Sequence, residues 1–231
     1  MRIASWKAVS RSARLSLPCK PLKLYQSNAS PNSRRVRMFL AEKNITVGII
    51  PVDLASRAQF SDAYKAINPR SQVPTLVLDD GTPIGEVLAI WRYLEEVYPE
   101  PPLLGRTPTG KALVTMWERR VELDGFCAVM EGVRNRAAGL DGRALSGPHA
   151  YDQIPELVTR SELRVQDFYA DLDARLQAVP FIAGERFSAA DITGLATLDF
   201  AAKGFDIPLP SEHVALERWY RMISARASAA V

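Results

Sequence analysis

The first hundred residues combine two kinds of apolar pattern. Short apolar runs, typical of strands, alternate with stretches in which apolar residues recur every three to four positions, as in amphipathic helices. The runs predict strands over 22–25, 46–52, 73–78 and 82–84, and the periodic stretches predict helices over 31–43, 59–67 and 87–98. The last of these has the clearest apolar face, formed by Val87, Ile90, Trp91, Leu94, Val97 and Tyr98. The predicted order of elements is βαβαββα.

This order also predicts how the strands pair. A helix between two strands gives the chain room to cross over, so the early strands are expected to be parallel. The last two strands are joined only by Asp79, Asp80 and Gly81, a tight turn that predicts an antiparallel hairpin. We therefore expect a mixed sheet in an α/β domain that spans residues 21–100.

The pattern changes after residue 99. Four prolines and a glycine fall within 99–108, which is typical of a linker. Beyond it only helices are predicted, over 109–136, 154–178, 189–203 and around 216–223, with a glycine-rich loop over 137–148. Residues 189–203 are apolar almost all round, as in a buried helix, and Ser188 with Asp191 fits a capping box at its start. Residues 107–231 are thus expected to form an all-helical domain.

Composition narrows the class of protein. The chain has 231 residues, 47% apolar and 24% charged, which is typical of a globular protein. No run of eighteen apolar residues exists, so a membrane span is not expected. The net charge is only +3 and no basic stripe is interleaved with aromatic residues, so nucleic acid is not an expected partner. Two histidines and two distant cysteines make no metal motif, and no metal is expected.

Residues 1–20 form a basic extension with five Lys or Arg residues and no Asp or Glu. Such a start resembles an organelle transit peptide, but a flexible tail or a start codon placed too far upstream explains it more simply. A secretory signal is disfavoured because no apolar core follows the basic residues. Cys19 and Cys127 are expected to stay reduced, and we expect a cytoplasmic protein.

Ser30 is the strongest candidate for chemistry. It follows the first predicted strand and precedes Pro31, so it suits the N-cap of a helix with proline in its first position. The free N–H groups and the positive dipole end of such a helix favour an anion. The spacing Ser-Pro-x-Ser resembles the Cys-Pro-x-Cys of thioredoxin-like redox sites, with hydroxyls in place of thiols. A hydroxyl there can donate a hydrogen bond to the thiolate of a bound ligand.

Four segments together resemble the cytosolic glutathione transferases, and most closely the bacterial enzymes of serine or cysteine type. They are residues 30–37, 68–74, 85–94 and 187–192, in the order and at the spacing of the family. The resemblance implies a thioredoxin-like domain followed by an all-helical domain, glutathione as co-substrate, a small hydrophobic electrophile as second substrate, a role in detoxification, and a homodimer.

The resemblance also implies roles for individual residues. Ser30 falls where serine-type transferases donate a hydrogen bond to the glutathione sulfur. Gln72, Val73 and Pro74 fall where the tripeptide is contacted, with Val73 pairing its backbone with the cysteinyl part and Pro74 at the position of a cis proline. Glu86 and Val87 fall where the γ-glutamyl end is held.

Val87 departs from the family pattern, which has Ser or Thr there. The missing hydroxyl removes a charge-assisted hydrogen bond of about 1.5–3 kcal/mol to the γ-glutamyl carboxylate.

Several alternatives remain open from the sequence. Ser27 and Tyr25 are rivals of Ser30 for the sulfur, and Ser30 can also be a plain helix cap. A non-catalytic ligand carrier or partner-binding module is the alternative function, supported by Val87. A disulfide reductase lacks the cysteine that it needs at position 30 or 33.

Overall fold

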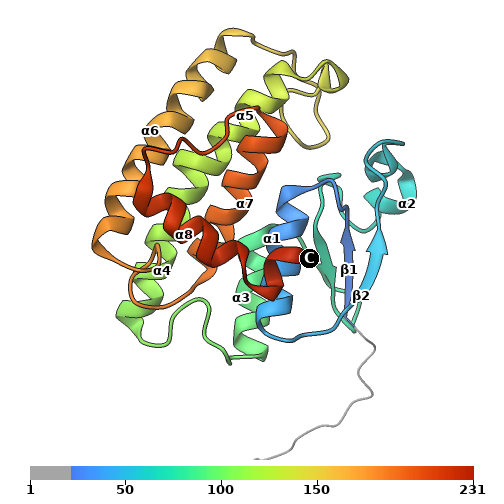
Figure 1. Ribbon diagram of the computed structural model, residues 1–231. Coiled ribbons are helices and arrows are strands. Elements are labelled where there is room, and N and C mark those ends of the chain that lie inside the picture. The colour runs from blue at the N-terminus through green and yellow to red at the C-terminus, as the bar shows by residue number, and fades with distance from the viewer. Residues whose placement is uncertain (1–21) are drawn as a thin grey trace, which may run out of the picture.

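The computed structural model describes residues 22–231, so the basic extension and Cys19 lie outside the described residues (Figure 1). The chain begins with a mixed four-stranded sheet in the order β2-β1-β3-β4. Its strands are β1 (Lys23–Gln26), β2 (Gly48–Pro51), β3 (Thr75–Val77) and β4 (Pro83–Ile84). β1 and β2 are parallel, while β3 is antiparallel to both β1 and β4. The parallel pairing of the first two strands and the antiparallel hairpin are confirmed, whereas β3, which also follows a helix, runs antiparallel to β1.

Three helices complete this domain and confirm the βαβαββα order. They are α1 (Pro31–Glu42), α2 (Asp62–Lys65) and α3 (Val87–Val97). α1 and α3 lie between the sheet and the rest of the molecule (Figure 1), and Phe39 of α1 stacks on Trp91 of α3 at 5.2 Å between ring centroids. The helix predicted over 59–67 is broken. A 3₁₀ turn, η1 (Ala58–Phe60), precedes α2 because the Ser61 side chain caps the backbone N–H of Tyr64 and starts a new helix.

The remainder is helical, as predicted. It contains α4 (Pro108–Arg120), α5 (Cys127–Arg136), α6 (Glu156–Ala178), α7 (Ala189–Gly204) and α8 (Val214–Ser224), with the 3₁₀ turns η3 (Ala138–Leu140) and η4 (Ala227–Ala230). The thioredoxin-like domain followed by a helical region is therefore confirmed. None of the helices within residues 22–231 is long and apolar enough to cross a bilayer.

The helix predicted over 109–136 is not one regular α-helix. A π-helical turn, η2 (Val121–Phe126), lies between α4 and α5. Within it, a Cβ on Gly125 would lie 2.6 Å from the ring of Phe168, so glycine allows α6 to approach closely. The wider turn also carries Glu122, whose carboxylate reaches Arg35 of α1 at 3.1 Å. The interruption thus serves packing against two neighbouring helices.

The capping box at the start of α7 is confirmed, and its role is structural. Asp191 is fully buried and accepts hydrogen bonds from the backbone and hydroxyl of Ser188 at 2.9 and 3.1 Å. It also accepts bonds from the Ile182 N–H at 3.0 Å and the Trp219 indole at 2.9 Å. One carboxylate therefore joins the start of α7, the preceding loop and α8.

Candidate functional site

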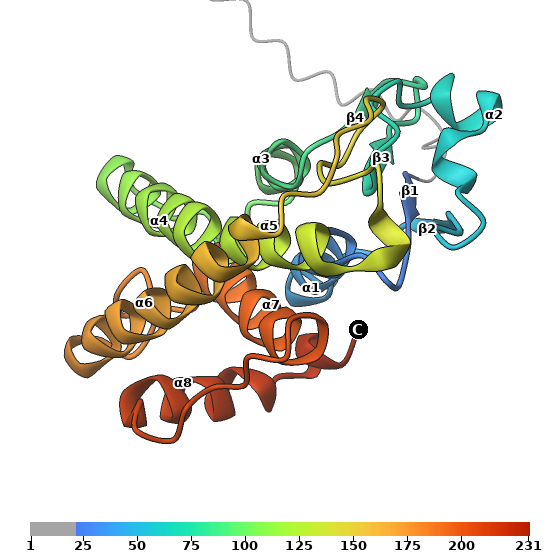
Figure 2. The ribbon, with the colours of Figure 1, turned by 90° about the horizontal axis from the view of Figure 1, so that it is seen from above.

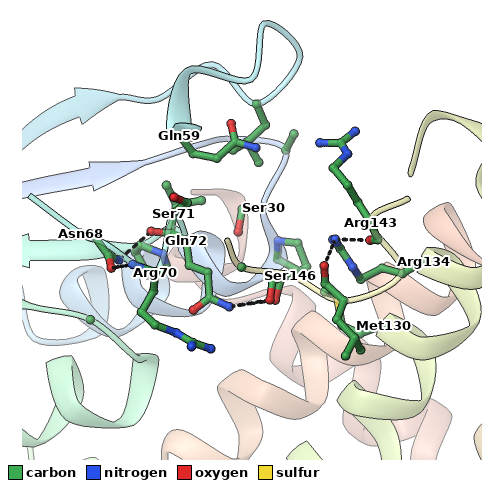
Figure 3. Close-up of a pocket in the computed structure, with 18 of the residues that line it drawn as sticks. Ser30, Gln59, Asn68, Arg70, Ser71, Gln72, Met130, Arg134, Arg143 and Ser146 are labelled. Carbon is green, nitrogen blue, oxygen red and sulfur yellow. Dashed lines mark hydrogen bonds between the residues drawn. The ribbon is translucent and has the colours of Figure 1, made fainter. Parts of the chain in front are cut away.

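A cavity of about 510 Å³ lies between the thioredoxin-like domain and the helical region (Figure 3). The six residues to which the sequence assigned a role line it together: Ser30, Gln72, Val73, Pro74, Glu86 and Val87. They come from the start of α1, from the loop before β3 and from the start of α3. Their assembly follows from the fold, because these loops meet at one edge of the sheet.

Ser30 is the N-cap of α1, with an extended backbone and Pro31 in the first helical position. Its Oγ accepts a hydrogen bond from the Ser33 N–H at 3.2 Å. No hydrogen bond within the described chain uses the hydroxyl hydrogen of Ser30, and the residue lines the cavity. Capping therefore uses one lone pair of Ser30 and leaves its O–H as a donor for a ligand.

The two rivals of Ser30 for the sulfur do not line this cavity. Tyr25 packs its ring edge-on against Tyr64, with centroids 6.1 Å apart. Ser27 is buried, and its backbone N–H donates to the Ser33 Oγ at 3.3 Å. Both lie before the start of α1, so only Ser30 among the three stands at the helix N-terminus and the cavity wall.

The loop before β3 presents backbone groups to the cavity. The carbonyl of Gln72 accepts hydrogen bonds from the Tyr64 hydroxyl at 2.6 Å and the Asn68 amide at 3.0 Å, which fixes the loop. The Val73–Pro74 peptide bond is cis, in agreement with the family pattern. Within residues 22–231, no hydrogen bond uses the N–H or C=O of Val73. These two groups are available to pair with an extended ligand.

The start of α3 forms the next part of the wall. Glu86 is the N-cap residue and has φ +62°, a left-handed conformation that is uncommon for residues other than glycine. Such backbone often occurs at ligand sites. Val87 follows at the first helical position, 6% exposed, and packs into the apolar core. The helix N-terminus still offers backbone N–H groups to an anion, without a side-chain hydroxyl beside them.

Two polar residues of the same wall have no counterpart in the sequence-based prediction. Gln59 of η1 and Ser71, which has φ +54°, line the cavity and are buried. The Oε1 of Gln59 and the Oγ of Ser71 have no hydrogen-bond partner in the described part of the chain. Unpartnered buried oxygens are costly unless a ligand or water satisfies them. The sequence assigns no role to either, because a single glutamine in a predicted helix and a single serine in a loop form no motif.

The opposite wall belongs to the helical region. Its apolar surface comes from Met130 and Val133 of α5 and Phe200 of α7, and Arg134 and Arg143 add two positive charges. Met130 belongs to the stretch 109–136 that the sequence predicts as a long helix.

The segment 138–151 crosses from α5 towards the tips of β3 and β4 (Figure 2). Its Ser146 hydroxyl accepts a hydrogen bond from the Gln72 amide at 2.9 Å. The two domains therefore both contribute to an enclosed cleft.

This arrangement can bind and activate a thiol. A ligand with an extended backbone would pair with Val73, place an anion at the start of α3 and direct a sulfur towards the Ser30 hydroxyl. Residues 22–231 contain no group of three or more His, Cys, Asp or Glu residues that could hold a metal ion. The apolar wall of α5 and α7 leaves room for a second molecule beside the sulfur.

Known proteins resemble this chain along most of its length. A sequence model of the glutathione S-transferase N-terminal domain matches residues 24–102. The chain is 32% identical over 223 residues to glutathione S-transferase 2 of Saccharomyces cerevisiae, covering 89% of this chain and 86% of the yeast protein. It is 44% identical over 99 residues to maleylacetoacetate isomerase of Rattus norvegicus, covering 42% of this chain and 45% of the rat protein. The crystal structure of a glutathione S-transferase domain-containing protein of Marinobacter aquaeolei matches with a TM-score of 0.82 and 34% identity, covering 89% of this chain and 98% of that chain.

Proposed function

This chain belongs to the glutathione S-transferase family, and we propose that it binds glutathione in the interdomain cavity and uses the Ser30 hydroxyl to stabilise the thiolate for attack on an electrophile. The observation that carries the proposal is the free O–H of Ser30 at the N-terminus of α1, in one cavity with Val73 and the start of α3. In this proposal the γ-glutamyl carboxylate binds near Glu86 and Val87. Gln72, Val73 and Pro74 hold the middle of the tripeptide.

The energies are sufficient for this role. A free thiol has a pKa near 8.5, so it is mostly protonated at neutral pH, and the thiolate is the nucleophile. Lowering the pKa by about two pH units needs about 2.7 kcal/mol. One hydrogen bond from a hydroxyl to the anion supplies about 1.5–3 kcal/mol, and the helix N-terminus adds about 0.3–1 kcal/mol.

The first test is calorimetric titration of the protein with reduced glutathione. We expect saturable binding in the micromolar to low millimolar range, because the cavity offers partners for the backbone, the thiol and a carboxylate. Oxidised glutathione and free cysteine are the matched controls, since each lacks one of these features. No heat of binding at two temperatures would reject the proposal and leave the non-catalytic alternative, which the relatives do not favour.

Two reactions begin with the same thiolate. In conjugation the sulfur stays bound to the electrophile, whereas in a glutathione-dependent isomerisation the sulfur adds to the substrate and then leaves. The relative named maleylacetoacetate isomerase aligns over 42% of this chain, and the relative named glutathione S-transferase aligns over 89%. We favour conjugation for this reason. Net consumption of glutathione with turnover distinguishes the two reactions.

Restoring a hydroxyl at position 87 is expected to tighten glutathione binding. In Val87→Ser the new O–H lies at the first turn of α3 and can donate to the γ-glutamyl carboxylate, so we expect the Kd to fall about tenfold or more. Val87→Ala is the matched control, because it removes the same methyl groups from the core without adding a donor. Equal Kd values for the two variants in calorimetry would show that no carboxylate binds at this helix start.

A further inference from the structure

The helical wall of the cavity combines apolar surface with uncompensated positive charge. Arg134 and Arg143 line it beside Met130, Val133 and Phe200. Neither arginine has a carboxylate partner among the ion pairs of the described residues. Among residues 22–231, the only acidic residue that lines the cavity is Glu86, at the start of α3. Apolar surface next to unpaired cations suits a ligand with an apolar body and an anionic group.

The two arginines have different tasks. The Arg134 guanidinium donates to the backbone carbonyls of Arg143 at 2.6 Å and of Leu145 at 2.9 Å, which holds the segment 138–151 against α5. Burial and the neighbouring charge of Arg143 lower the pKa of Arg134. Two neighbouring cations repel each other, so an anion bound beside both arginines in the cavity would reduce this electrostatic repulsion.

Arg143 is the one with free donors. Its Nη2 donates to the Gly139 carbonyl at 2.6 Å, whereas no hydrogen bond within the described part of the chain uses its Nη1. Figure 3 shows Arg143 and Arg134 on the helical side, across the cavity from Gln59 and Arg70, with Ser30 between them. An unpaired guanidinium N–H on the wall of a cavity is a strong site for a carboxylate.

Glutathione has other partners for its own carboxylates. The N–H groups at the start of α3 and the Arg70 guanidinium both lie on the thioredoxin-like side of the cavity. The cations on the helical side therefore face the space left for the second substrate.

We propose that the second substrate is an amphipathic electrophile with a carboxylate, and that Arg143 selects it by binding this carboxylate. The inference rests on the proposed function and names the substrate class of the same site. In it, the apolar part of the electrophile packs on Met130, Val133 and Phe200, and the carboxylate accepts a hydrogen bond from the Nη1–H of Arg143. Arg134 acts as a positioning residue that keeps Arg143 in place.

The test uses two aryl chlorides that differ in charge, 4-chloro-3,5-dinitrobenzoate and its methyl ester. In both, the glutathione thiolate forms a C–S bond at the ring carbon that bears chlorine, and chloride leaves with the electron pair. Each kcat/KM is divided by the rate constant of the uncatalysed reaction, which removes the difference in intrinsic reactivity. We expect the carboxylate to be favoured by about tenfold or more.

Arg143→Gln is expected to lower the corrected kcat/KM for the carboxylate about ten- to hundredfold and to change that for the ester less than about threefold. Arg143→Lys keeps the charge and should retain most of the preference. Arg92→Gln removes a charge from the exposed face of α3 and should change neither value. Equal losses for both chlorides with a raised KM for glutathione would assign Arg143 to glutathione and overturn the inference, while the transferase proposal would stand.

The two proposals fail in different ways. If the corrected kcat/KM is higher for the ester than for the carboxylate, the substrate inference is overturned and the proposed function still stands. If neither chloride reacts, the Kd values of the two glutathione conjugates are compared by calorimetry, and equal values overturn it. Binding of neither glutathione nor its conjugates rejects the proposed function and with it this inference.

Discussion

Replacing Ser30 by glycine is expected to raise the pKa of bound glutathione by about one to two pH units and to lower kcat at pH 7 about ten- to hundredfold. The reason is the loss of a hydroxyl donor worth about 1.5–3 kcal/mol to the thiolate, where 1.36 kcal/mol corresponds to one pH unit. Because the pKa rises, the pH–rate profile should move to higher pH, and activity should recover partly at pH 9. Ultraviolet absorbance of the thiolate, titrated against pH, measures the shift directly.

Glycine is chosen because Ser30 also caps α1. Its Oγ accepts the Ser33 N–H, and replacing a capping serine by alanine costs about 0.5–2 kcal/mol of stability. Glycine is tolerated at an N-cap with a loss of only about a few tenths of a kcal/mol, so Ser30→Gly removes the donor and largely keeps the helix start. Binding of glutathione should change little, since the other contacts remain.

Two further variants separate the hydroxyl from the local structure. Ser30→Thr keeps both the cap and the donor and should retain a lowered thiol pKa. Ser33→Ala removes the hydroxyl that accepts the Ser27 N–H, but position 33 does not line the cavity, so the thiol pKa should stay as in the original protein. An unchanged thiol pKa in Ser30→Gly would mean that another group holds the sulfur, and the role of Ser30 would be that of a cap.

The parts of the fold that the sequence predicted are those with strong local causes. The apolar period of α3, the Ser30-Pro31 start of α1 and the Ser188–Asp191 capping box all appear as expected. The η2 turn was not predictable in the same way. The pattern over 109–136 predicts one helix throughout, whereas the π-helical turn packs Gly125 against Phe168, a residue far away in the chain.

The candidate site also combines features predictable from local sequence with features that depend on tertiary contacts. The segments around Ser30, 72–74 and 86–87 have family spacing, so the sequence predicts a shared site for them, and the fold places them in one cavity. Gln59, Ser71 and Arg143 carry no sequence signal. They stand out only because the tertiary structure brings them to one cavity and leaves a polar atom of each without a hydrogen-bond partner.

Replacing Arg35 by methionine is expected to destabilise the protein by about 3–5 kcal/mol. Arg35 is fully buried in α1, and its guanidinium donates to the carboxylates of Glu118 at 2.7 Å and Glu122 at 3.1 Å. It also lies over the rings of Trp91 and Phe126, at 5.2 and 4.8 Å. Methionine preserves much of the packing but leaves the Glu118 carboxylate buried without its counter-charge, which is the costly outcome. Denaturant unfolding of both proteins at the same pH measures the loss.

The loss should depend on pH, and the sign follows from Glu118. Burial raises the pKa of this carboxyl above its ordinary value, and the charge of Arg35 opposes the rise. Without Arg35 the pKa in the folded state rises further. A carboxyl of raised pKa favours folding below its unfolded pKa of about 4.3, and this contribution is lost as the pH increases through the folded value. The destabilisation of Arg35→Met should therefore be larger at pH 8 than at pH 5.

A second substitution separates the buried charge from lost packing. Arg35→Met with Glu118→Met removes both charges, and buried pairs replaced by apolar residues are often as stable as the original, so we expect most of the loss to be regained. Arg92→Met breaks an exposed pair with Glu96 on α3 and should cost less than about 0.5 kcal/mol. If the double variant is no more stable than Arg35→Met, the stacking on Trp91 and Phe126 holds α1 against the helical domain, and the ion pair contributes little. If it is more stable, the charge of Arg35 is needed mainly because Glu118 is buried beside it. The position of α1, whose N-cap is Ser30, would then be maintained by apolar packing once no buried charge is left unpaired.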